Sequence, residues 1–296
     1  MRHLKAIAGS TRLRSILLAL LAALSLAILA AGAQAANLKP ETHAAFDRYV
    51  KLTDQRNAEE LSSNKDFLWI DALAPAARTR AYQSLASGNV EISHRETLEN
   101  GKEIPCPNGL IHHWIGTVFI RGATLDEVLR ILQDYNHQAR YYGPDVQQSR
   151  IEAQDGVHFR VFLRFRRTEV IAAVIDTVND VQYFRDSPNR AHSRSSAIRV
   201  NEVENPGARN EQEKPSGQDN GFLWGMETWW RMEEKNGGVY VQSEVVSLTR
   251  DIPPGLGWLI GPFVNSIPRE SLTFTLDATR RAVLAEKERD GDAAAN

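Results

Sequence analysis

Cysteine is almost absent from this sequence of 296 residues, because Cys106 is the only one. A single cysteine excludes an intrachain disulfide bond. Cys106 lies between Pro105 and Pro107, far from the N-terminal segment, so lipid attachment to a cysteine at a signal cleavage site is also excluded. A lone cysteine in such a turn is more often incidental than catalytic, and we expect it to have no chemical role.

Several catalytic and metal-binding motifs are missing as well. The sequence contains no H-E-x-x-H, C-x-x-C, G-x-S-x-G or G-x-x-x-x-G-K-[ST] string, so hydrolase, redox and nucleotide chemistries lack their usual local signals. His112 and His113 are adjacent, but neighbouring residues of a strand point to opposite faces and cannot hold one ion together. We expect one of them to face solvent and the other to lie at the edge of the core. The sequence therefore predicts neither a metal site nor a cofactor.

Acidic residues are absent from the first 35 positions. Arg2, Lys5, Arg12 and Arg14 form a basic region there, residues 16–31 are apolar apart from Ser25, and residues 33–35 read Ala-Gln-Ala. This order is typical of a cleaved signal peptide, so residues 1–35 predict export to the periplasm or the medium. The alternative is an uncleaved anchor that keeps the protein on a membrane, but the apolar run is shorter than the ~20 residues that span a bilayer.

The mature chain is acidic. After removal of the signal, 31 of the 35 basic residues remain against all 37 acidic ones, which leaves a net charge of about −6. Such a charge argues against nucleic acid as the main partner. The remaining length suffices for one domain with an N-terminal extension.

Hydrophobic periodicity divides the mature chain into a mostly helical extension (36–108) and a larger domain (109–288). Residues 37–88 have helical spacing, and residues 90–99 alternate like one strand. The larger domain begins with a strand over 110–120 and a helix whose start is marked by a capping box from Thr124 to Glu127. Alternation and turn signals then predict six further strands, and a long amphipathic helix over 268–288 ends the domain. The six strands cover 146–153, 157–167, 170–184, 191–203, 222–233 and 239–250, and residues 289–296 are predicted to be a disordered tail.

This order predicts an α+β fold in which a curved antiparallel sheet of about seven strands wraps around the long C-terminal helix. Within the larger domain, only the helix after the first strand and the final helix are available to cover a face of the sheet. Curving the sheet around the final helix encloses apolar space, which predicts a pocket for an apolar ligand. Its lining is predicted to come from Phe159, Val161, Leu163, Trp224, Met226, Trp230, Leu272 and Leu276.

Carboxylates in the strands are candidates for a polar role in that pocket. Glu244 could fix the polar end of a ligand or act as a general acid or base, although the alternation around it does not decide which face it occupies. Asp176 is a similar candidate, and Arg194 or Arg199 on the next strand could pair with it. Glu227 lies opposite the apolar face of its strand and is expected to be exposed.

The segment GLGWLIGPF precedes the final helix. Its three glycines and Pro262 oppose a regular helix, yet Trp258 and Phe263 within it are apolar. Such a segment suits a flexible gate or a rim that touches a membrane, with Trp258 and Phe263 as ligand contacts. The alternative is a packed hinge before the final helix.

A family resemblance is carried by the strand HHWIGTVFI, the helix opening GATLDEVLRILQDY, the segment ARYYGPDV and the final stretches SLTRDIPPGLGWLIGPF and PRESLTFTLDATRRAV. With these, residues 109–288 resemble the START-like superfamily, which has a helix-grip fold and includes coenzyme Q-binding START proteins, lipid-transfer domains and polyketide cyclases. The strings ATLDEVL, NEVENPG and LTRDIPPGLGWLIGPFV resemble a secreted bacterial subgroup. The resemblance implies a lipid or other hydrophobic ligand between the sheet and the final helix, but no particular ligand.

We therefore predict an exported protein that holds a lipid, an isoprenoid or another hydrophobic small molecule, with transient membrane contact and without nucleic acid. One alternative is an enzyme of the cyclase or aromatase type that uses Glu244, Asp176 or a tyrosine as acid or base. Another is an envelope interaction module with a filled core. The ligand, the oligomeric state and the role of residues 36–108 stay open at this point.

Overall fold

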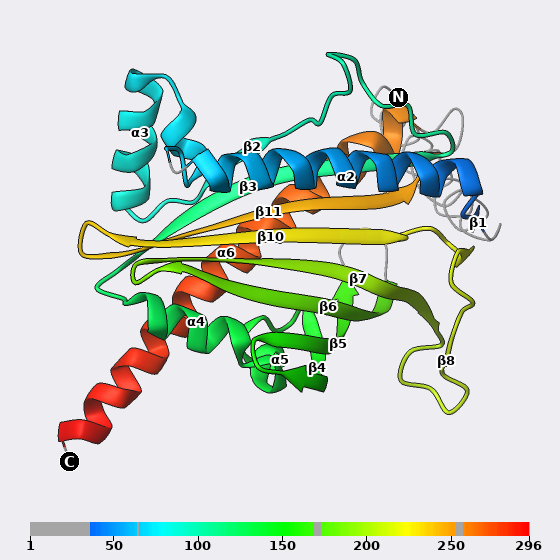
Figure 1. Cartoon of the computed structure of the whole chain (residues 1–296). Helices are drawn as coiled ribbons and strands as arrows, with labels where there is room; N and C mark the ends of the chain where they lie inside the picture. Colours follow the sequence, from blue (N-terminus) through cyan, green and yellow to red (C-terminus); the bar gives the residue numbers. More distant parts are fainter. Residues whose placement is uncertain (1–35, 64, 168–172, 253–256, 296) are drawn as a thin grey trace, which may run out of the picture.

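The computed structural model describes residues 36–63, 65–167, 173–252 and 257–295, and a nine-stranded antiparallel sheet lies at its centre (Figure 1). The strands are β2 Glu91–His94, β3 Gly109–Arg121, β4 Val146–Asp155, β5 His158–Arg167, β6 Ala173–Ser187, β7 Arg190–Glu204, β8 Gln212–Glu213, β10 Gly225–Lys235 and β11 Gly238–Arg250. They are ordered β2-β3-β11-β10-β7-β6-β5-β4, and β8 pairs with β7. The sheet thus includes the seven predicted strands of the larger domain, and β2 and β8 extend it.

Helices cover both faces of this sheet. The long helix α6 (Gly257–Ala295) crosses one face, where α4 (Leu125–Gln133), η2 (Tyr135–His137) and α5 (Gln138–Tyr141) also lie. The helix α2 (Pro40–Ser63) runs along the opposite face, followed by η1 (Trp69–Ala72) and α3 (Pro75–Ala86) (Figure 1). We call the face toward α6 the inner face and the face toward α2 the outer face. This is the helix-grip arrangement that the resemblance implied, with an added helical layer on the outside.

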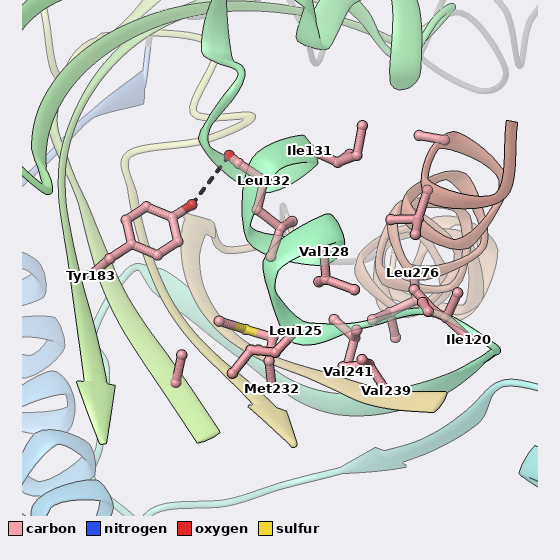
Figure 2. Close-up of a cluster of buried hydrophobic side chains, with 14 of the residues drawn as sticks. Ile120, Leu125, Val128, Ile131, Leu132, Tyr183, Met232, Val239, Val241 and Leu276 are labelled. Carbon is pink, nitrogen blue, oxygen red and sulfur yellow. Dashed lines mark hydrogen bonds between the residues drawn. The ribbon is translucent and has the colours of Figure 1, made fainter. Parts of the chain in front are cut away.

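The largest hydrophobic cluster lies on the inner face (Figure 2). Leu125, Val128 and Leu132 of α4 lie in one cluster with Met232 of β10, Val241 of β11 and Leu276 of α6. The capping box that predicted α4 is confirmed, because the Thr124 hydroxyl accepts from the Glu127 amide at 3.3 Å and the Thr124 amide donates to the Glu127 carboxylate at 2.8 Å.

The outer face is also apolar along the central strands. Phe46 and Tyr49 of α2 pack against Trp229, Val246 and Leu248 of β10 and β11. The central strands are therefore covered on both sides, and most residues of β11 are buried although several of them are polar. The two helices of the larger domain cover the inner face as predicted, and α2 of the extension covers the second face.

The predicted hairpins are present. Gly156, between β4 and β5, has a φ of +56°, and the turn between β10 and β11 places Asn236 and Gly237 at φ values of +58° and +74°. Positive φ at both central residues is the type I′ pattern, whose twist matches that of the flanking strands. These turns hold β10 and β11 in a register in which Trp230 lies opposite Ser243.

Helix α6 differs from the prediction at both ends. It begins at Gly257 rather than near residue 268 and continues to Ala295, so the segment 289–295 is helical instead of a disordered tail. Pro262 and Pro268 lie inside it. Proline lacks the N–H donor and crowds the preceding turn, but a long helix can continue through it with a local loss of hydrogen bonding. No helix among the described residues combines the length and the hydropathy needed to cross a bilayer.

Candidate functional site

The inner face gathers most of the predicted ligand contacts. Phe159, Val161 and Leu163 of β5 lie in one cluster with Leu272 and Leu276 of α6. Trp230 of β10 packs against the same cluster. Met226 shares the face of Trp230, because the two residues are an even number of positions apart on the same strand. The strands and α6 thus bring these side chains together.

Solvent exposure differs along this face. Val118, Met232 and Val241 are completely buried. Trp114 and Val245 also face inward, yet they are only half-buried, as are the predicted contacts Leu163, Met226 and Trp230. Water therefore reaches apolar side chains on the inner face at one end of the sheet, whereas the other end is packed core. Leu276 belongs to the packed end, because it is fully buried and its Cδ1 lies 2.7 Å from the position a Cβ on Gly116 would take.

Tyrosine hydroxyls form the polar part of the inner face. The Tyr135 and Tyr183 hydroxyls are 2.8 Å apart, and Tyr183 also donates to the Leu132 carbonyl oxygen at 3.1 Å (Figure 2). Tyr142 contacts the Thr279 hydroxyl on α6 at 2.9 Å. Burial raises the pKa of all three tyrosines, that of Tyr142 to about 12. They are therefore uncharged at neutral pH and can donate hydrogen bonds but cannot act as bases.

Two serines add unsatisfied polar groups to the same face. Ser193 of β7 and Ser243 of β11 lie on either side of Trp230 in the strand register, and each is 1% exposed. Among the described residues, neither hydroxyl has a hydrogen-bond partner. The Ser193 hydroxyl lies near enough to Tyr183 to lower the pKa of its phenol, but outside hydrogen-bonding geometry. Unsatisfied buried hydroxyls are rare, so this row can accept a neutral polar group.

Glu244 lies on the outer face, not in the predicted pocket. Its carboxylate is 0% exposed and accepts from His113 Nε2 at 2.6 Å, from Asn57 Nδ2 at 3.1 Å and from the Arg56 guanidinium. Burial acts to raise the pKa of Glu244, but His113 and Arg56 outweigh it and hold the pKa at about 2. Glu244 therefore joins α2 to the sheet as a charged anchor.

His113 continues this anchor. Burial lowers its pKa against the opposing effect of the Glu244 hydrogen bond, so its ring is neutral. Because Nε2 faces a carboxylate, it carries the proton, and Nδ1 accepts from the Tyr49 hydroxyl at 2.9 Å. The Tyr49 oxygen accepts in turn from the Thr97 amide at 2.7 Å. The expectation of one solvent-facing histidine is wrong, since both His112 and His113 are buried.

Other polar side chains fasten α2 in the same way. Arg231 of β10 is 1% exposed and donates to the Phe67 carbonyl oxygen at 2.9 Å, to Asn57 and to Glu60. Arg194 of β7 binds both carboxylate oxygens of Asp54, at 2.7 and 2.8 Å. These bonds hold α2 of the extension against the outer face.

Three further expectations need correction. Trp224 packs in the outer cluster with α2, where its indole N–H donates to Asp219 at 2.9 Å. Asp176 is buried but pairs with Arg164 of the preceding strand, at 2.7 Å to each oxygen, and not with an arginine of the next strand. Glu227 is half-buried under α2 and pairs with Arg194 at 2.9 Å. Asp176 and Glu227 follow the alternation of their strands and face outward. Trp224 precedes β10 and packs on the outer face, although its spacing from Met226 and Trp230 had predicted the inner face.

Trp258 and Phe263 lie within the helical segment that begins α6, but their side chains fall outside the described residues. No cluster of three metal-ligating side chains occurs in the part of the chain that the structure describes. Trp114, Ser193 and Ser243 were not predicted as components of the inner face. Their even spacing from apolar residues on the same strands was the signal that could have identified them.

Comparison with known proteins yields structural relatives only. No family model matches the sequence, and no curated protein matches it. Human StAR-related lipid transfer protein 5 aligns with a TM-score of 0.46 and 14% identity, covering 79% of this chain and 99% of its own. Human STARD10 aligns with a TM-score of 0.44 and 8% identity, covering 74% of this chain and 84% of its own. A STAR-related lipid transfer protein fragment from Xanthomonas axonopodis aligns with a TM-score of 0.40 and 18% identity, covering 65% of this chain and 98% of its own. Each of these likenesses is one of fold alone.

Proposed function

We propose that this protein is an exported binding protein that holds a hydrophobic small molecule between the inner face and α6. The ligand class is a lipid, an isoprenoid such as a coenzyme Q-type compound, or another apolar molecule of similar length. Export rests on the basic and apolar series of residues 1–35.

The half-buried apolar strip on the inner face carries this proposal. Trp114, Leu163, Met226, Trp230 and Val245 face the long helix but remain in contact with water. Burying apolar surface contributes about 25 cal/mol of stabilising free energy for each Å², and the exposed part of this strip lacks that contribution. An apolar ligand recovers that free energy, at roughly 0.8 kcal/mol per methylene. Ten buried methylenes correspond to about 8 kcal/mol, the order of a micromolar dissociation constant before entropic costs.

The polar groups of the inner face favour an uncharged ligand head. The carboxylates of Glu244 and Asp176 both point away from α6, toward Arg56 and Arg164 respectively. Tyr183, Ser193 and Ser243 offer neutral hydroxyls instead. A hydroxyl, ester or ketone finds partners among them. A carboxylate or phosphate would need a cation, and Arg167 of β5, which contacts Ser271 of α6, is already paired with Asp145.

A cyclase-type enzyme needs a group that removes a proton from the substrate. The two carboxylates suggested for that role lie on the outer face or in an ion pair, and the inner tyrosines have raised pKa values. These tyrosines could polarise a carbonyl oxygen but not act as the base. The geometry therefore favours binding over catalysis.

Native mass spectrometry and lipid extraction of the processed protein test the proposal. We expect a bound apolar molecule that co-purifies. Thr228→Trp places an indole on the inner face between Val245 and Ser195, at a half-buried position, and should reduce both co-purified ligand and binding of a hydrophobic fluorescent probe. Gln182→Trp, on an exposed position of β6, is the matched control and should behave like the parent. If no ligand co-purifies and the parent, Thr228→Trp and Gln182→Trp all bind the probe equally weakly, the result favours an interaction module with a filled core.

A further inference from the structure

The first described residues of the chain form a small structure with a distant loop. β1 (Ala36–Asn37) pairs antiparallel with β9 (Gln218–Asp219), with Ala36 opposite Asp219. The Leu38 amide donates to the Gly217 carbonyl oxygen at 2.8 Å, so Leu38 and Gly217 are a hydrogen-bonded pair. Such pairs alternate along an antiparallel ladder, which makes Ala36 and Asp219 the next one, with α-carbons about 5.5 Å apart. The Ala36 nitrogen therefore faces the main chain of Asp219.

Asp219 is a buried carboxylate with an unused oxygen. It is 1% exposed, and its Oδ1 accepts from the Gly221 amide at 2.7 Å and from the Trp224 indole at 2.9 Å. Its Oδ2 has no hydrogen-bond partner in the part of the chain that the structure describes. A buried, unsatisfied carboxylate oxygen is costly and demands an explanation.

A second carboxylate increases that cost. Glu202 of β7 is 3% exposed and accepts from the amides of Asn220 and Phe222, each at 2.9 Å. Burial, and then the charge of Glu202, raise the pKa of Asp219 to about 6. Lys214 lies 3.8 Å from Glu202, and Arg250 donates to the Asn220 carbonyl oxygen at 3.2 Å, so both nearby cations are engaged away from Oδ2.

We propose that cleavage of the peptide bond between Ala35 and Ala36 completes this site, because the new α-ammonium group of Ala36 binds the carboxylate of Asp219. An endopeptidase adds water across the bond, so that Ala35 leaves with the signal as a carboxylate and Ala36 becomes a primary amine that takes up a proton. The cleavage position is the one that the Ala-Gln-Ala signal predicts. This inference rests on the export part of the proposed function.

Cleavage changes the chemistry of the Ala36 nitrogen, and Ala36 is paired with Asp219. Before cleavage, the Ala36 nitrogen is a neutral amide with one hydrogen, which the strand pairing uses. After cleavage it has three hydrogens and a positive charge, so it can keep the bond to the main chain and donate to Oδ2. A charge-assisted hydrogen bond of this kind is about twice as strong as a neutral one. Processing thus fastens β1 to β9.

The test uses the processed protein isolated from cells, its Asp219→Asn variant and an Asp155→Asn control in the exposed β4–β5 turn. N-terminal sequencing should begin at Ala36. The pKa of the α-amino group, followed by NMR, should lie at least one unit above its ordinary value of about 8 in the parent and the control, and near that value in Asp219→Asn. Selective acetylation of the α-amine should lower Tm by several degrees in the parent and the control only.

A mature chain that begins at another residue overturns the inference. So does an ordinary amine pKa in the parent, or an equal effect of acetylation on parent and Asp219→Asn. Hydrophobic-probe binding is measured on the same samples. Normal probe binding with any of these outcomes rejects the terminal ion pair alone, whereas lost probe binding in the unmodified parent rejects the proposed ligand site.

Discussion

Replacing Glu244 with glutamine tests the assignment of this carboxylate to the outer face. The amide has nearly the same shape, but it has no charge and only one acceptor oxygen. Three donors, on Arg56, Asn57 and His113, point at the carboxylate in the parent. Glu244→Gln therefore leaves at least one buried donor unsatisfied and deprives Arg56 of its buried counter-charge.

The expected loss is large. Removing one partner of a buried ion pair typically costs about 3–5 kcal/mol. The pKa gives a consistent magnitude, since a shift from 4.5 to about 2 corresponds to roughly 3 kcal/mol. At about 2–4 °C per kcal/mol for a domain of this size, we expect Tm to fall by roughly 6–20 °C at neutral pH. Glu152→Gln, which removes the exposed pair with Arg150, should cost less than about 1 kcal/mol.

The pH dependence has a definite sign. The pKa of Glu244 is lower in the folded protein than in the unfolded chain, so its contribution is complete above pH ~4.5 and is lost as the pH falls toward 2. The parent should therefore lose more stability than Glu244→Gln over that interval, and the two unfolding curves should converge. Denaturant unfolding at several pH values, monitored by tryptophan fluorescence, measures this difference.

Probe binding distinguishes a role of Glu244 on the outer face from a role in the ligand site. Below its Tm, Glu244→Gln should bind a hydrophobic probe as the parent does, because Glu244 contacts α2 and not the inner face. Unchanged stability together with lost probe binding would refute the reasoning and return Glu244 to the ligand site.

Two further substitutions test the packed end of the inner face. Leu276→Trp should lower the free energy of unfolding by about 1–3 kcal/mol through overpacking, because Leu276 is fully buried against Gly116. An unchanged Tm in thermal unfolding would instead show that free space exists beside Leu276. Gly116→Ala should cost a similar amount, since its Cβ would lie 2.7 Å from Leu276 Cδ1 and 3.2 Å from the Glu91 carbonyl oxygen. The double variant Gly116→Ala with Leu276→Val should recover part of that loss. Full additivity of the two stability changes would contradict the contact between these residues.

Local signals predicted most of the elements. The Thr124–Glu127 capping box and the Gly156 and Asn236–Gly237 turns depend on residues within a few positions of each other, and all are present as predicted. The apolar face of β5 is also as predicted, because alternation along a strand is a local property. The extent of α6 was underestimated, since its glycines and prolines are locally unfavourable to helix but did not end it.

The assignment of faces depended on contacts that no local pattern contains. Each face of β10 and β11 carries both apolar and polar side chains, so alternation divides their residues into two sets without saying which set meets α6. The tertiary structure decides this through bonds such as Arg56 to Glu244, 188 positions apart, and Arg194 to Asp54, 140 positions apart. The sequence alone thus determined the strands, the hairpin turns and the start of α4, because those depend on neighbouring residues. Only the tertiary structure decided that α2 covers the outer face and that Glu244 and Trp224 lie beneath it, because docking α2 satisfies buried charges supplied by strands far along the chain.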